Sequence, residues 1–163
     1  MRRTVAPICA LLFVLMLVLA ATQPVRAQFP APAPSALSIP QDQLIQTDEL
    51  VRILKSSEKD KPVILQVGSR VMFSQAHIPG SEYAGPASTQ SGIQSLENAV
   101  AALPKNRRII LYCGCCPWNR CPTVGPAYKR MRELGFTRVQ VLFIANNFGD
   151  DWVNKGYPAV NGN

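Results

Sequence analysis

The stretch IILYCGCCPWNRCPT, residues 109–123, joins a short apolar run to a loop that is rich in cysteine. Residues 108–112, RIILY, consist mainly of branched apolar side chains and have the length of a strand buried on both faces. A helical pattern begins at Pro126, so the loop connects a strand to a helix, where parallel sheets bind their ligands. Four cysteines lie within nine positions of this loop: Cys113, Cys115, Cys116 and Cys121.

Strand and helix patterns alternate along the rest of the chain. Apolar runs predict further strands over residues 62–67 and 139–144. Thr47 has the character of a helix-capping residue at the start of the first helical pattern. The alternation predicts an α/β fold in which helices cover both faces of a parallel sheet. Apolar spacing predicts helices over residues 47–56, 93–103, 126–134 and a short closing stretch that ends near residue 156.

The first 27 residues have the layout of a secretory signal peptide. Two arginines precede an uncharged apolar run over residues 6–21, and Val25-Arg26-Ala27 has the small-residue pattern of a cleavage site. We expect cleavage after Ala27 and hence a periplasmic or secreted protein, which would contact a membrane only if the segment were retained. Residues 28–40, rich in Pro and Ala, predict an extended linker, and residues 41–163 form one domain.

Most of the excess positive charge belongs to the N-terminal segment. Cleavage after Ala27 removes three arginines and no acid, so the formal net charge falls from +7 to +4. The remaining basic residues are not interleaved with aromatic residues along a stripe, as they are in many nucleic-acid-binding surfaces. We therefore expect no nucleic-acid partner.

Four motifs, in order, resemble those of the rhodanese superfamily of sulfurtransferases. The resemblance covers about residues 45–160 and implies a central parallel sheet of about five strands, flanked by helices on both faces. Phe73 also matches an aromatic residue that precedes the family's histidine by four positions. The four motifs are HIPGS at residues 77–81, IILYC at 109–113, LGFTRVQVL at 134–142 and DDWVNKGYPAV at 150–160.

The chain departs from the family pattern at several places around the predicted site. Where the family usually has Asp-Val-Arg after its second strand, this chain has Gln66-Val67-Gly68, so the supporting ion pair is missing or rebuilt. Ala76 replaces the glycine before the histidine, and Asn146 begins a segment where a Gly-Gly pair is common. The catalytic loop is longer than usual and carries three cysteines beyond Cys113.

The resemblance implies that sulfane sulfur passes from a small anionic donor, such as thiosulfate, to a thiol or cyanide-like acceptor. The intermediate is a persulfide on a cysteine whose thiolate attacks the donor. Because a free thiol has a pKa of about 8.5, the site must favour the anion. Backbone N–H groups that converge on the sulfur ahead of a helix can supply this preference without a metal.

Two criteria select different nucleophiles. Position directly after the strand selects Cys113, whereas the six-residue spacing from Cys115 to Arg120 matches the usual length of the family's loop. We favour Cys113, with Cys115 as the alternative, because a strand fixes the direction of a side chain and a lengthened loop does not. Arg120 would then bind the anionic donor. The other expected substrate-binding residues are Gly114, Cys115, Cys116 and Trp118.

The cysteine cluster also fits a thiol-disulfide or sulfur-carrier module that does not turn over thiosulfate. Cys113 and Cys116 form a Cys-x-x-Cys pair, and Cys116 with Cys121 is a second disulfide candidate, which an oxidising compartment would favour. A protein thiol is then the expected partner. Zinc sites usually use two cysteine pairs about a dozen residues apart, so we predict no metal and no other cofactor. We expect His77 to be a hydrogen-bonded turn residue rather than a general base.

Overall fold

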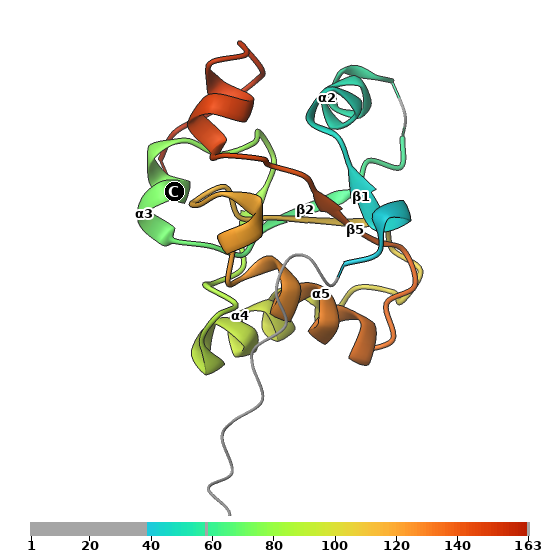
Figure 1. Cartoon of the computed structure of the whole chain (residues 1–163). Coiled ribbons are helices and arrows are strands. Elements are labelled where there is room, and N and C mark those ends of the chain that lie inside the picture. The colour runs from blue at the N-terminus through green and yellow to red at the C-terminus, as the bar shows by residue number, and fades with distance from the viewer. Residues whose placement is uncertain (1–38, 58, 163) are drawn as a thin grey trace, which may run out of the picture. The chain divides into compact units, whose positions relative to one another are not determined.

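The computed structural model describes residues 39–57 and 59–162, which contain a five-stranded parallel sheet (Figure 1). The spatial order of the strands is β1-β5-β4-β2-β3, so β4 is central and both edge strands are only two residues long. In register, Gln66 of β2 lies beside Tyr112 of β4. The strands are β1 (Leu44–Ile45), β2 (Val63–Gln66), β3 (Glu82–Tyr83), β4 (Ile109–Tyr112) and β5 (Val139–Leu142).

Helices cover both faces of the sheet, as the sequence predicts. Helices α4 (Gln90–Val100) and α5 (Val124–Glu133) pack on one face, below the sheet in Figure 1. Helix α2 (Thr47–Lys55) and the π-helix η4 (Gly149–Val153) pack on the other. The remaining helical segments are α3 (Arg70–Gln75), η2 (Gln41–Gln43) and η3 (Trp118–Arg120).

Strand β4 divides its side chains between two buried clusters. Ile109 and Leu111 pack toward α4 and α5, whereas Ile110 and Tyr112 pack toward α2 and η4. Every residue of the strand is 1% exposed or less, which explains why it is apolar on both faces. The alternation continues one residue beyond the strand, so that the Cys113 side chain lies on the α4 and α5 side.

The hydroxyl group of Tyr112 joins the sheet to the HIPGS turn. This hydroxyl accepts a hydrogen bond from the Ile78 N–H (3.3 Å) and lies 3.0 Å from the Ser81 hydroxyl. Burial raises the pKa of Tyr112 to about 12, although the hydrogen bonds from Ser81 and Ile78 oppose the rise. The HIPGS turn is thereby attached to the residue that immediately precedes Cys113.

The α/β prediction is confirmed, but several local expectations are wrong. Thr47 does not cap its helix: it is the first helical residue and is buried, and Gln46 at the N-cap makes no side-chain capping bond. Helix α4 begins earlier than predicted because the Thr89 hydroxyl accepts a hydrogen bond from the Gly92 N–H (3.0 Å). The closing helix is a π-helix. Strands β1 and β3 and helix α3 are too short to show a periodic pattern.

The predicted signal peptide and residues 28–38 of the predicted linker lie outside the described residues, so the domain boundaries stay predictions. Within the described ranges, no helix has the length and apolar character required to cross a bilayer.

Candidate active site

The cysteine loop begins at the carboxyl end of β4 and leads through η3 into α5. Cys113 and Cys121 are buried, at 4% and 5% exposure, and belong to the core beneath α4 and α5. Cys115 is exposed and Cys116 is half-buried. The loop therefore holds two buried thiols at its base and presents the others nearer to solvent.

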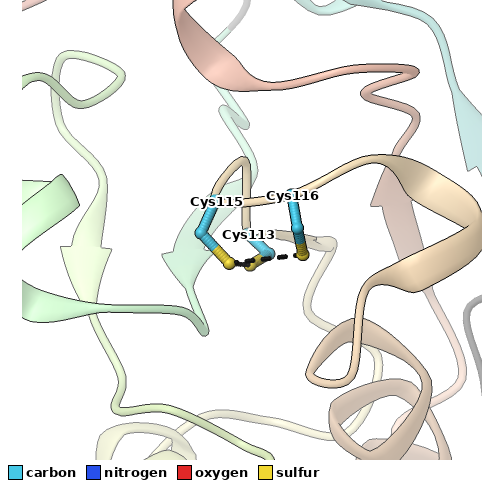
Figure 2. A group of neighbouring side chains, drawn as sticks. All are labelled: Cys113, Cys115 and Cys116. Carbon is cyan, nitrogen blue, oxygen red and sulfur yellow. Dashed lines mark hydrogen bonds between the residues drawn. The ribbon is translucent and has the colours of Figure 1, made fainter.

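Three of the sulfur atoms point toward one another (Figure 2). The Sγ atoms of Cys113 and Cys115 are 2.9 Å apart, and those of Cys115 and Cys116 are 3.4 Å apart. A disulfide bond is about 2.05 Å long, and all four cysteines in the described part of the chain are free thiols. The Cys113–Cys116 and Cys116–Cys121 disulfides stay predictions, and the nearest pair is one that sequence spacing did not select.

Hydrogen bonding among the thiols shifts the pKa values of the two buried cysteines. The hydrogen bond to Cys115 raises the pKa of Cys113 to about 12, and burial adds to the rise, while bonds from Cys121 and Thr123 oppose it. The pKa of Cys121 is also raised, first by its hydrogen bond to Cys113 and then by burial. The raised pKa of Cys113 favours its protonated form, and in the 2.9 Å contact with Cys115 either sulfur can be the donor.

Gln66 and Gly68, which stand where the family usually has the Asp and Arg of Asp-Val-Arg, both lie beside Cys113. The buried Gln66 side chain donates a hydrogen bond to the Cys113 carbonyl (3.2 Å) and accepts one from the Gly68 N–H (3.1 Å). The expected ion pair is therefore replaced by neutral amide hydrogen bonds that connect β2 to the loop. A Cβ atom on Gly68 would lie 2.8 Å from the Cys113 Sγ, so glycine leaves room for the sulfur.

A cavity of about 140 Å³ opens beside Cys113 at the carboxyl ends of β2 and β4. Its lining carries no charged side chain. Cys113 reaches this cavity, but Cys115 is not part of its lining. The lining residues are Gln66, Met72, Gln75, Ala76, Tyr112, Cys113, Phe148, Gly149 and Val153.

The backbone around Gly114 forms a sharp turn after the strand. Gly114 has a φ of 75°, and its carbonyl accepts a hydrogen bond from the Phe148 N–H (2.9 Å). A Cβ atom on Gly114 would lie 2.7 Å from the Phe148 Cβ, so the site requires glycine for both reasons. The N–H groups of Gly114, Cys115 and Cys116 donate no hydrogen bond to another described residue, which leaves them available to an anion.

Trp118 and Arg120 lie on the loop but outside the cavity lining. The Trp118 ring packs against Phe143, with ring centroids 5.1 Å apart, and the Trp118 backbone N–H donates a hydrogen bond to the Ala145 carbonyl (3.0 Å). Arg120 is exposed, and its guanidinium group has no hydrogen bond or ion pair with a described residue. Trp118 therefore holds the loop against β5, and Arg120 is free to meet a ligand from solvent.

The contacts of His77 confirm that it is a turn residue. Its Nδ1 lies 2.8 Å from the Phe73 carbonyl, and its ring stacks on Phe73 with centroids 3.9 Å apart. Its backbone N–H and carbonyl both pair with Val160. These contacts connect α3, the HIPGS turn and the C-terminal segment.

Sequence reasoning missed Gln66, Met72 and Phe148 as parts of the site. Gln66 ends an apolar strand pattern, and a polar residue at that position was a signal that could have identified it. Met72 lies in α3, which no periodic pattern predicted, and Phe148 reaches the loop from beyond β5.

The rhodanese-like domain family model matches residues 40–143, which is more than half of the chain. The chain belongs to the rhodanese-like domain family. This is a family of sulfurtransferase type, and the five-stranded parallel sheet agrees with its fold. A search of curated proteins found no significant match.

Solved structures of other proteins share this fold at low sequence identity. A rhodanese-like domain from Anabaena sp. is 22% identical over 73% of this chain and 79% of its own, with a TM-score of 0.56. A protein from Bacillus halodurans is 20% identical over 72% of this chain and 75% of its own, with a TM-score of 0.55. EanB, solved in a persulfide state with ergothioneine, is 25% identical over 72% of this chain but only 27% of its own (TM-score 0.54).

Substitution of Gly68 by Ala tests the packing of this rhodanese-like site. The new Cβ would meet the Cys113 sulfur, so we expect Gly68→Ala to lower the free energy of unfolding by about 1–3 kcal/mol, the usual cost of overpacking. In a Cys113→Ala background the sulfur is absent, and the cost should fall. Urea denaturation of the four proteins in this double-mutant cycle measures the coupling. Equal costs in the two backgrounds would contradict the contact.

Proposed function

We propose that this rhodanese-like protein transfers sulfane sulfur from an anionic, thiosulfate-like donor to a thiophilic acceptor through a persulfide on Cys113. The observation that carries the proposal is the position of the Cys113 thiol. It follows the central strand, lines a cavity and lies 2.9 Å from the sulfur of Cys115. The EanB structure in a persulfide state supports this chemistry by analogy, since that protein has a related fold.

In the first step, Cys113 attacks the outer sulfur of thiosulfate. Once Cys115 is deprotonated, it takes the proton of Cys113 across their 2.9 Å contact, and a bond forms between the Cys113 Sγ and the outer sulfur. The sulfur–sulfur bond of thiosulfate breaks, and its electron pair leaves with sulfite. After Cys115 returns the proton, the products are a Cys113 persulfide and sulfite, so atoms and charge balance. Cys115 thus serves as the base for a nucleophile that is itself protonated at rest.

Loop amides and Arg120 supply the attraction for the donor. The N–H groups of Gly114, Cys115 and Cys116 follow the positive φ of Gly114, as in the backbone turns that bind anions. Helix α5 begins just beyond the loop and has no side-chain cap, so its N-terminal dipole adds to this attraction. Arg120 can approach a dianion from the solvent side.

The second step passes the outer sulfur to a thiol or to cyanide. The acceptor attacks that sulfur, and the Cys113 thiolate leaves. The uncharged lining of the cavity accommodates a neutral persulfide and a small acceptor without a competing charge. A protein thiol could reach the same sulfur only through the cavity opening, because Cys113 is 4% exposed.

Thiol-disulfide exchange is the second candidate function, and the 2.9 Å contact between Cys113 and Cys115 favours it. An exposed thiol beside a buried one is an arrangement in which a partner's thiol can attack the exposed sulfur of a disulfide. This function would need no sulfur donor.

Cyanide-dependent turnover tests the first proposal. With excess cyanide and thiosulfate, the full-length protein should form thiocyanate, and early alkylation followed by peptide mapping should find the added sulfur on Cys113. Cys113→Ser should lose all thiocyanate formation, whereas Cys115→Ser should keep a slower rate because it lacks only the base. Loss of the adduct in Cys115→Ser alone would make Cys115 the nucleophile. A reversible disulfide with no adduct in any variant would favour the redox function.

We also propose that the protein is exported and cleaved after Ala27, on the basis of the N-terminal pattern. Intact mass of the protein expressed in a bacterial host with its own N-terminus should show a chain that begins at Gln28 in the periplasmic fraction. An uncleaved chain in the membrane fraction would indicate a retained anchor, and an uncleaved chain in the cytoplasm would contradict export.

A further inference from the structure

The contact between Cys113 and Cys115 also permits a reaction that is not part of sulfur transfer to an external acceptor. We propose that Cys115 attacks the Cys113 persulfide, releases its outer sulfur as hydrogen sulfide and leaves a Cys113–Cys115 disulfide. This inference rests on the persulfide proposed above. It makes the protein a thiol-dependent sulfide-releasing enzyme that carries the reductant for one turnover in its own loop.

The positions of the two thiols determine which sulfur atom Cys115 meets. Cys113 lines the cavity and Cys115 does not, so the cavity is the space into which an added outer sulfur can extend. The Cys115 Sγ lies against the Cys113 Sγ, which becomes the inner sulfur of the persulfide. Attack on the inner sulfur expels sulfide, whereas attack on the outer sulfur would only move it to another cysteine.

The step balances without a further reactant. A bond forms between the Sγ atoms of Cys113 and Cys115, and the bond between Cys113 and the outer sulfur breaks. The electron pair of that bond leaves with the outer sulfur, which departs as hydrosulfide with the persulfide proton and takes its second proton from water to become hydrogen sulfide. The outer sulfur is reduced by two electrons, and the two cysteines are oxidised to a disulfide.

The loop favours Cys115 over the other two thiols. Cys121 also hydrogen-bonds Cys113, but Cys121 is buried, and this hydrogen bond together with burial raises its pKa, so its thiolate forms less readily. Cys116 lies beside Cys115, at 3.4 Å, and its thiol is oriented toward the Arg120 carbonyl (3.9 Å). Gly114 supplies the bend between Cys113 and Cys115 that brings their sulfur atoms together.

Regeneration of the two free thiols requires an external dithiol. The exposure of each cysteine determines which sulfur that dithiol attacks. Cys115 is the exposed half of the proposed disulfide, whereas Cys113 is buried. A reducing thiol would therefore attack the Cys115 sulfur and release Cys113 for the next donor. The partner class is a dithiol reductant, whether a small molecule or a protein, and only the first turnover proceeds without it.

A single-turnover experiment tests the inference. The reduced full-length protein is freed of reductant and mixed with thiosulfate under argon, without cyanide. We expect about one sulfide per chain, in keeping with the proposed two-electron step, and a Cys113–Cys115 disulfide by peptide mapping. Added dithiol should then restore repeated sulfide release. Cys115→Ser should release no sulfide and should accumulate the Cys113 persulfide. The control Lys155→Ser changes an exposed residue outside the loop and the cavity lining, and it should behave like the unsubstituted protein.

The outcomes separate this inference from the function on which it rests. A stable Cys113 persulfide in the unsubstituted protein, with no sulfide, would overturn the inference and leave sulfur transfer intact. A disulfide that maps to another pair of cysteines, or sulfide release that persists in Cys115→Ser, would also overturn it. If no thiosulfate sulfur reached Cys113 in any variant, the sulfurtransferase proposal itself would fail.

Discussion

The hydrogen bond from the Gln66 side chain to the Cys113 carbonyl connects the scaffold to the chemistry. It joins the end of β2 to the residue after β4, at the edge of the sheet where the cavity opens. The Gln66 side chain also accepts a hydrogen bond from the Gly68 N–H. This bond positions the Gly68 backbone beside the Cys113 sulfur. Because all these groups are buried, loss of either hydrogen bond would leave an unpaired polar group, at a cost of about 1–3 kcal/mol.

A neutral amide in place of an ion pair changes the electrostatics of the site. An aspartate at residue 66 would place a negative charge beside the Cys113 carbonyl and oppose formation of a thiolate. Gln66 keeps the structural connection without that charge, and the cavity lining is uncharged throughout. The charge of the resting site is then determined mainly by the thiols themselves, and the raised pKa of Cys113 favours its protonated form.

The sequence predicts the scaffold better than the arrangement within the loop. The continuous apolar run RIILY predicts a buried strand and places Cys113 at its end, because this pattern is local. The 2.9 Å contact of Cys113 with Cys115 depends on the positive φ of Gly114 and on its hydrogen bond to Phe148, 34 positions away. The Cys-x-x-Cys spacing takes account of neither constraint, so it predicts Cys116, rather than Cys115, as the partner of Cys113. The two-residue edge strands likewise exist through pairing with β2 and β5 rather than through a pattern of their own.

A crystal structure of the Cys115→Ser variant soaked in thiosulfate tests the central claim most directly, because persulfide resolution is blocked in that variant. The account predicts density for one additional sulfur bonded to the Cys113 Sγ and extending into the cavity beside Tyr112 and Phe148. An unmodified Cys113 with the added sulfur on Cys116, or no bound sulfur at all, would contradict it.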